Sequence, residues 1–499
     1  MSHLIKKNKY LYKLLVCFFV ISLLILTYQC YEKYLGNKIY YLLFSIIFNF
    51  YLFFSFRNKA IFFDKFLSIL LWLGFWFKFT IVVTYYNGKF NEVGINVNYD
   101  VLVYDKSLIL SCISITAIIF ASILREIFFS YKINNLNARL EGLQFYSKYK
   151  FLIIFTFLFA VVVVCFLNLD YRLYQKGMIP LYTINSLFSS IVKWLLLLGF
   201  ASISSTILIF EIYNRKKITA IFFSIIILPI ALSSFSMLSR DMIFNSSAIL
   251  YGLYASNKFL NLKIGVKFFL KYFCILIFFS YLSILSINYL RANYYYTEKS
   301  NINFNITNKE IDLKNNKKYS DIKSSHNELL HLVVFRFVGI NAVINVLFES
   351  QKLSFDLFKK SFDEKSIEET NPEEKTFYET NFNFYEKQNF NLTPGVKGNT
   401  LPGLIAFLLY SGSYLFLFLS LLCVYLFCAL LEKISYHISK NYIFSSLIGM
   451  ILAYRFVHFG YAPGNSYKII LGIFLSCLII FLINKFLLIF LKKKKFYEN

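Results

Sequence analysis

The stretch FLIIFTFLFAVVVVCFLNL fills residues 151–169 and contains neither a basic nor an acidic side chain. As an α-helix it would be about 28 Å long, close to the roughly 30 Å thickness of a hydrocarbon core. A helix also pairs its own backbone N–H and C=O groups, which lipid cannot do. The stretch therefore predicts a membrane-spanning helix.

Similar stretches recur along the whole chain. Its 499 residues are 58% hydrophobic and 16% charged, a balance that a soluble domain of this length could not bury. We therefore predict an all-α polytopic membrane protein with about twelve transmembrane helices. The expected spans are 11–30, 39–56, 61–85, 108–124, 151–169, 186–212, 218–236, 242–257, 268–288, 402–430, 442–459 and 468–491.

The basic residues between these spans alternate from one connection to the next. Lys and Arg accumulate on the cytoplasmic side of membrane proteins, so the alternation predicts topology. Both termini are expected in the cytoplasm, and the outer side receives one large loop. The connections rich in Lys and Arg are the amino terminus, 57–59, 125–150, 215–217, 258–267, 433–440 and the tail 492–495.

The net charge of +25 has the same origin. Residues 291–400 hold 15 basic and 15 acidic side chains, so the whole excess lies in the remaining segments. We interpret it as topological charge and expect no nucleic-acid partner. The eight cysteines lie in or beside apolar segments, and no CxxC pattern occurs, so neither a disulfide framework nor a metal site is predicted.

The predicted organisation has three parts: a membrane bundle over 1–288, the large outer loop over 289–401, and a second bundle part over 402–499. Within the loop, 328–351 (ELLHLVVFRFVGINAVINVLFESQ) has apolar residues at helical spacing. This pattern predicts an amphipathic helix on the membrane surface. The acidic segment 363–374 is interpreted as a solvated charge run, because it lacks the spacing of a calcium loop.

Five arginines are expected on the outer side. An arginine at membrane depth usually faces a cavity or a partner, and its planar fork binds phosphate oxygens in pairs. Several fixed cations could neutralise a departing diphosphate on a lipid carrier without a metal or cofactor. The five are Arg172, Arg240, Arg291, Arg336 and Arg455.

Other residue types complete this candidate site. His458 follows Arg455 by one helical turn and is suited to proton transfer near neutral pH, and Asp241 is the other candidate base. Lys176 is a candidate substrate ligand, and Tyr294 could stack on a sugar.

Structural interpretations stand beside these roles. Arg240 could pair with Asp241, Arg291 could anchor a helix end at the interface, and Arg172 with Lys176 could extend to the membrane surface. Arg336 could be solvated, His458 could be a hydrogen-bonded structural residue, and Tyr294 could belong to an interfacial belt of tyrosines.

The order of the arginine segments resembles a known family. SMLSRDMIFNSSAILYGLYASNK is followed by INYLRANY, then VVFRFVGINAVINVLFE in the large loop, then AYRFVHFG near the end. This layout is similar to the Wzy-like O-antigen or oligosaccharide repeat-unit polymerases, and among them to the enterobacterial common antigen polymerases. The resemblance covers about residues 160–480 and implies a GT-C-like bundle.

The resemblance implies a glycosyltransferase of the bacterial inner membrane with its active site facing the periplasm. Its members join repeat units linked to undecaprenyl diphosphate, which serve as donor and acceptor, for lipopolysaccharide or similar surface polysaccharides. Arg240, Arg291, Arg336 and Arg455 match the family's outer arginines, and a chain-length co-polymerase is the implied partner.

Two alternatives remain open. An O-antigen ligase would use a similar bundle, a large outer loop, and outer arginine and histidine. A flippase for lipid-linked oligosaccharides would make no bond. The sequence disfavours the flippase because the outer loop is long and the spans are expected to be nearly charge-free, with Lys193 as the main exception.

Overall fold

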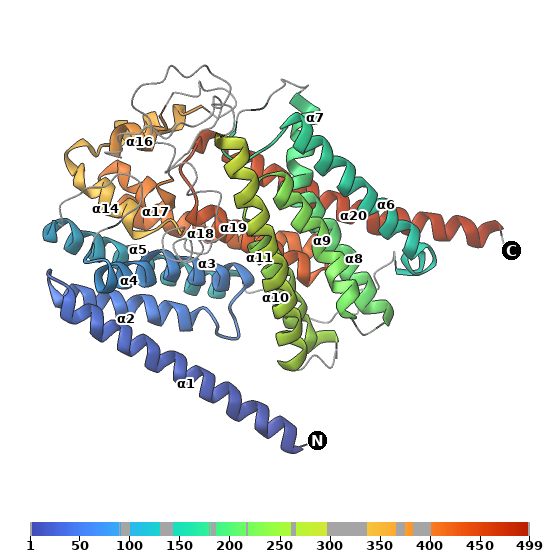
Figure 1. Ribbon diagram of the computed structural model, residues 1–499, viewed down its shortest axis with the longest axis horizontal. Helices are drawn as coiled ribbons and strands as arrows, with labels where there is room; N and C mark the ends of the chain where they lie inside the picture. The colour runs from blue at the N-terminus through green and yellow to red at the C-terminus, as the bar shows by residue number, and fades with distance from the viewer. Residues whose placement is uncertain are drawn as a thin grey trace, which may run out of the picture.

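The computed structural model describes residues 2–88, 90, 100–129, 143–178, 180, 186–215, 218–260, 266–296, 337–365, 375–382 and 401–497. Every regular element in these ranges is a helix (Figure 1). In chain order they are α1 (Ser2–Lys33), α2 (Lys38–Phe54), α3 (Phe62–Trp72), the π-helix η1 (Leu73–Phe77), α4 (Lys78–Tyr85), α5 (Val101–Phe129), α6 (Leu143–Tyr171), α7 (Ser186–Trp194), the π-helix η2 (Leu195–Gly199), α8 (Phe200–Arg215), α9 (Ala220–Ser236), α10 (Met242–Leu260), α11 (Val266–Tyr296), α14 (Ile340–Phe348), η4 (Ser350–Lys352), α15 (Phe355–Lys360), η5 (Ser361–Asp363), α16 (Phe377–Phe382), α17 (Gly403–Leu408), η7 (Leu409–Ser411), α18 (Tyr414–Ser439), α19 (Tyr442–Val457), η8 (Pro463–Ser466) and α20 (Tyr467–Tyr497).

The all-helical, multi-pass class predicted from the sequence is confirmed. Within the described ranges, eight helices are long and apolar enough to cross a membrane. Three further apolar helices, α2, α9 and α19, are shorter. A total of twelve spans and the orientation of the termini stay predictions.

Polar side chains at the helix starts explain several boundaries. Asn37 accepts a hydrogen bond from the Ile39 N–H (2.9 Å) at the start of α2, and Asn441 accepts one from the Ile443 N–H (2.9 Å) at the start of α19. These caps satisfy amide groups that have no partner inside the helix. The start of α3 is capped from elsewhere in the chain, because the buried Glu432 of α18 accepts from the Phe63 N–H at 2.7 Å.

The expected single span over 402–430 is wrong in one respect. The chain forms the short α17, continues through η7, and breaks at Gly412, whose φ is +73°. Ser413 then caps α18 by accepting from the Phe416 N–H at 3.2 Å. A glycine in the left-handed region followed by a capping serine is a helix stop and restart, which the apolar composition of the segment concealed.

The described parts of the long loop fold onto the bundle. Helix α14 packs against α5, with α16 and α17 beside it (Figure 1). The helix expected over 328–351 is observed only over 340–348, and 328–336 lie outside the described residues. Most side chains of α14 are buried within the protein, and a position of the whole segment on the membrane surface stays a prediction. At the other side of the loop, α11 runs to Tyr296, beyond the boundary expected at 288.

The centre of the bundle is built from α3, α10 and α19, which pack closely together. Helix α1 lies at one edge (Figure 1), and only 11% of its apolar window is buried within the protein. The same window of α6 is 17% buried, against 78% for 62–85. The lipid-facing helices are therefore peripheral, while 62–85 is central.

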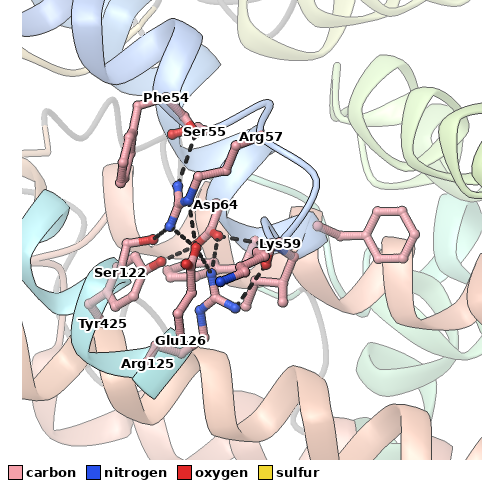
Figure 2. Close-up of polar contacts among 12 residues, drawn as sticks. Phe54, Ser55, Arg57, Lys59, Asp64, Ser122, Arg125, Glu126 and Tyr425 are labelled. Atoms are coloured by element: carbon pink, nitrogen blue, oxygen red, sulfur yellow. Dashed lines mark hydrogen bonds and ion pairs between the residues drawn. The ribbon is translucent and has the colours of Figure 1, made fainter. Parts of the chain in front are cut away.

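Buried charges contradict the expectation of nearly charge-free spans. Arg125 of α5 and Asp64 of α3 form an ion pair at 2.8 Å, and each side chain is 1% exposed. Tyr425 of α18 donates to the other oxygen of Asp64. Figure 2 shows this cluster, in which Arg57 and Glu126 form a second ion pair beside the first. Because every charge has an opposite partner, the cluster can lie inside the bundle and join α3, α5 and α18.

Candidate anion-binding site

Two arginines meet at the turn between α9 and α10. Arg240 belongs to the turn, and its Nε donates to Oδ1 of Asn288 on α11 at 3.0 Å. Arg291, one turn further along α11, donates from its Nε to the Leu238 carbonyl at 2.9 Å. Leu238 has a φ of +51°, and this left-handed conformation is uncommon for leucine. The two contacts together hold the turn against α11 and gather both guanidinium groups there.

Asp241 has a different partner from its neighbour Arg240. Its carboxylate forms an ion pair with Lys176, which lies in the segment after α6. The Lys176 backbone N–H also donates to the Met237 carbonyl at 3.0 Å, so the segment is fixed to the same turn. Asp241 therefore pairs with a residue 65 positions away in the sequence.

The electrostatics of Asp241 decide its chemical role. Burial alone would raise the pKa of this carboxyl, but the ion pair with Lys176, and more weakly Arg455, outweigh burial and hold the pKa at about 2. A carboxylate with so low a pKa is a weak base near neutral pH. Asp241 is thus suited to orienting Lys176, and its role as a base stays a prediction.

The end of α19 supplies the histidine of the site. Tyr454 donates its hydroxyl to Asp241 at 3.4 Å, and its ring stacks on the imidazole of His458 with centroids 4.1 Å apart. The His458 Nδ1 lies 3.2 Å from the Tyr454 carbonyl. A carbonyl can only accept, so in the neutral imidazole this contact favours the tautomer with the proton on Nδ1 and the lone pair on Nε2.

The structure thus brings six of the sequence-predicted residues to one end of α9, α11 and α19. They are Lys176, Arg240, Asp241, Arg291, Arg455 and His458.

Three other predicted residues are not among these six. Arg172 directly follows the end of α6 and has a φ of +48°. Arg336 and the side chain of Tyr294 lie outside the described part of the chain.

Sequence reasoning missed three residues near this site. Asn288 lies three positions before Arg291 on the same face of α11, a spacing that could have suggested a shared contact. Tyr454 precedes Arg455, and no local pattern marks it. Glu364 was interpreted as part of a solvated charge run, but it accepts from the Phe377 N–H (2.9 Å) and the Ala462 N–H (3.0 Å). It therefore joins the long loop to the connection that follows α19.

The arrangement is suited to binding an anion. Arg240 and Arg291 are both partly exposed, and each donates to a neutral oxygen acceptor, Oδ1 of Asn288 or the Leu238 carbonyl. Lys176 adds an ammonium group whose side chain is 27% exposed. Among the described residues, no group of three or more His, Cys, Asp and Glu could hold a metal ion.

Fold and site together define a helical, multi-pass membrane protein with a cationic cluster at one end of its bundle. Comparisons with protein-family models, with curated protein sequences and with solved structures give no match.

Proposed function

We propose that this protein is a repeat-unit polymerase that joins oligosaccharides linked to undecaprenyl diphosphate, at the periplasmic face of a bacterial inner membrane. The observation that carries the proposal is the gathering of Arg240, Arg291 and Lys176 around one turn beside His458. Resemblance in the order of the arginine segments supports the same class of reaction.

In the proposed reaction, a hydroxyl at the non-reducing end of the acceptor attacks the anomeric carbon of the donor. The bond from that carbon to the diphosphate oxygen breaks, and undecaprenyl diphosphate leaves. Negative charge grows on the leaving oxygen, and fixed guanidinium groups stabilise it more in the transition state than in the ground state. Arg240 and Arg291 are assigned this role, with Arg336 as a further candidate from the sequence.

His458 is the proposed base. With the Nδ1 proton donated to the Tyr454 carbonyl, Nε2 carries the lone pair that accepts the hydroxyl proton. Arg455 and Lys176 are assigned to binding the diphosphate or an acidic sugar. Tyr294 keeps its predicted role in sugar stacking, and a chain-length co-polymerase remains the proposed partner.

The test replaces Arg240 and Arg291 with alanine in cells that lack the wild-type copy. Surface glycans separated on a gel should lose the long-chain ladder and retain single capped units, because loss of such a cation lowers turnover by about 100-fold. Arg215→Ala is the matched control, since that side chain is 57% exposed and pairs with Glu211. A full ladder in both Arg240→Ala and Arg291→Ala cells would exclude the proposal.

An O-antigen ligase is the nearest alternative, and its product separates it from a polymerase. Loss of a ligase leaves long polymer on the lipid carrier, whereas loss of a polymerase leaves single units. The lipids extracted from the Arg240→Ala cells distinguish the two.

A transporter of lipid-linked oligosaccharides is favoured by one observation, the buried Arg125–Asp64 cluster. Ionisable groups inside membrane bundles often belong to transport pathways. Purified protein in vesicles should lengthen the glycan if it is a polymerase, and should only move the lipid between leaflets if it is a transporter.

A further inference from the structure

A fully buried lysine lies in the middle of the central span 62–85. Lys78 is 0% exposed and follows directly after the π-helix η1. Its Nζ donates to the Phe337 carbonyl at 2.9 Å and to Oδ1 of Asn341 at 3.2 Å. A cationic side chain at such depth is costly, and π-helical segments often occur at functional sites. Lys78 therefore joins the core of the bundle to the first turn of α14 and to the residues just before it.

The backbones at this place are in contact. A Cβ atom on Gly74 of η1 would overlap the Val338 carbonyl oxygen, and one on Gly339 would overlap the Gly74 carbonyl oxygen. Neither position has room for a side chain. The backbone of segment 337–339 thus lies directly against the backbone of η1. Lys78 donates a hydrogen bond to the same segment.

The other end of the long loop returns to the same place. The Gly403 N–H donates to the Phe459 carbonyl at 3.0 Å, and a Cβ on Gly403 would lie 2.7 Å from the Val457 carbonyl oxygen and 3.0 Å from Val338. We call the two segments 337–341 and 402–404 the loop root. Both parts of the root lie against the bundle and against each other.

The loop root touches the candidate site from two directions. The Phe337 ring packs on Phe244 with centroids 6.4 Å apart, and Phe244 packs on Tyr454 at 5.0 Å. Gly403 contacts Val457 and Phe459, the residues on either side of His458 in the sequence. Contacts from the root therefore reach both the Tyr454 ring, through Phe244, and the backbone that flanks His458.

We propose that Lys78 is a positioning residue that seats the loop root and thereby holds His458 in the geometry for proton transfer. This inference rests on the proposed function for its consequence in catalysis. The seating of the root is a structural claim that can be tested without any activity.

The structural arm uses Ala342→Cys as a reporter, because Ala342 lies on α14 and is 1% exposed. In the full-length protein, a polar maleimide should leave the introduced thiol unmodified, as read by mass spectrometry of the peptide. Adding Lys78→Met should raise modification of that thiol by about tenfold, because the root loses the amine that holds it. Lys65→Met is the matched control, since Lys65 lies in the same span and contacts the rings of Phe62 and Tyr251 instead.

The functional arm separates binding from turnover. Lys78→Met should bind undecaprenyl diphosphate within about twofold of wild type, since Arg240 and Arg291 keep their contacts, while polymerisation falls by about tenfold or more. A general loss of structure would instead weaken both. The proposal is overturned if the reporter thiol stays protected and turnover matches that of Lys65→Met.

A second variant keeps the test decisive if Lys78→Met fails to fold. Gly339→Ala retains the lysine but displaces the root, so it should reproduce both effects. Gly472→Ala is its control, because a Cβ there meets its nearest neighbour at an ordinary 3.5 Å. Wild-type protein that makes no polymer would refute the proposed function, while the labelling result would still decide whether Lys78 seats the root.

Discussion

Arg240 and Asp241 are adjacent in sequence but contact different partners. The Asp241 carboxylate forms an ion pair with Lys176, while the Arg240 guanidinium donates to the neutral side-chain amide of Asn288. A neutral partner fixes a guanidinium group and still allows it to attract an anion. The Asp241 carboxylate is thus engaged with Lys176, while the Arg240 guanidinium contacts a neutral acceptor.

The low pKa of Asp241 predicts how stability depends on pH. The pKa is about 2 in the folded protein and about 4 in an unfolded chain, so the ionised form stabilises the fold by about 2 kcal/mol above pH 4. This contribution is lost as the pH falls from about 4 to about 2. Thermal unfolding in detergent should show the loss in wild type and not in Asp241→Asn. Equal acid sensitivity of the two proteins would contradict this assignment.

The buried pair of Arg125 and Asp64 predicts strong coupling between the two residues. Arg125→Met leaves a carboxylate inside the bundle and should destabilise the protein by about 3–5 kcal/mol. Asp64→Asn in the same chain removes that charge, so the double variant should recover a large part of the loss. Denaturation midpoints of the four proteins form a double-mutant cycle, and additive effects would show that the pair is uncoupled.

At the candidate site, the sequence predicts which residues are important but not which residues they contact. The types and order of Arg240, Arg291, Arg455 and His458 could be selected because charge is rare in apolar segments. Their partners could not, since Lys176 reaches Asp241 across 65 residues and Asn288 looks like any polar residue near a helix end. Contacts of this kind depend on packing between helices that no local pattern describes.

At the scale of the elements, helices α3 and α19 pack closely at a glycine that lets their backbones approach. A Cβ on Gly449 of α19 would lie 2.8 Å from the Phe63 nitrogen and 3.0 Å from the Glu432 carboxylate. Gly449 therefore also makes room for the carboxylate that caps α3. At this one position, α19 packs against α3 and the start of α3 is capped.

Gly449→Ala should destabilise the protein by about 1–3 kcal/mol through overpacking. The added methyl meets backbone atoms, which cannot rotate away as the end of a flexible side chain could. The measurement is the thermal midpoint in detergent, with Gly472→Ala as the tolerated substitution for comparison. A midpoint for Gly449→Ala equal to that of the control would show that α3 and α19 can separate at little cost.

Helix positions were the most predictable part of the fold. The expected spans 39–56, 61–85 and 218–236 agree closely with α2, α3 through α4, and α9, because apolar length determines them. The break at Gly412 was concealed by apolar neighbours on both sides. The burial of α14 was also unpredictable, since an amphipathic pattern does not say whether its apolar face meets lipid or protein.

At the scale of the whole molecule, the charge pattern predicts which end of the bundle faces the cytoplasm. Asn58 lies in the basic connection 57–59 and Lys468 lies in the first turn of α20, and both are exposed. In intact cells, a membrane-impermeant thiol reagent should label Lys468→Cys and leave Asn58→Cys unlabelled until the membrane is opened. Labelling of both from outside would contradict the topology.

The most direct measurement is the binding of undecaprenyl diphosphate to the purified protein. We expect salt-dependent binding that weakens by about tenfold or more in Arg240→Ala and Arg291→Ala, because each loses a charge-assisted contact. Arg215→Ala should bind as wild type does, since its side chain is exposed beside Glu211. Equal affinity in wild type and in the Arg240→Ala/Arg291→Ala double variant would contradict the assignment of this turn as the diphosphate site.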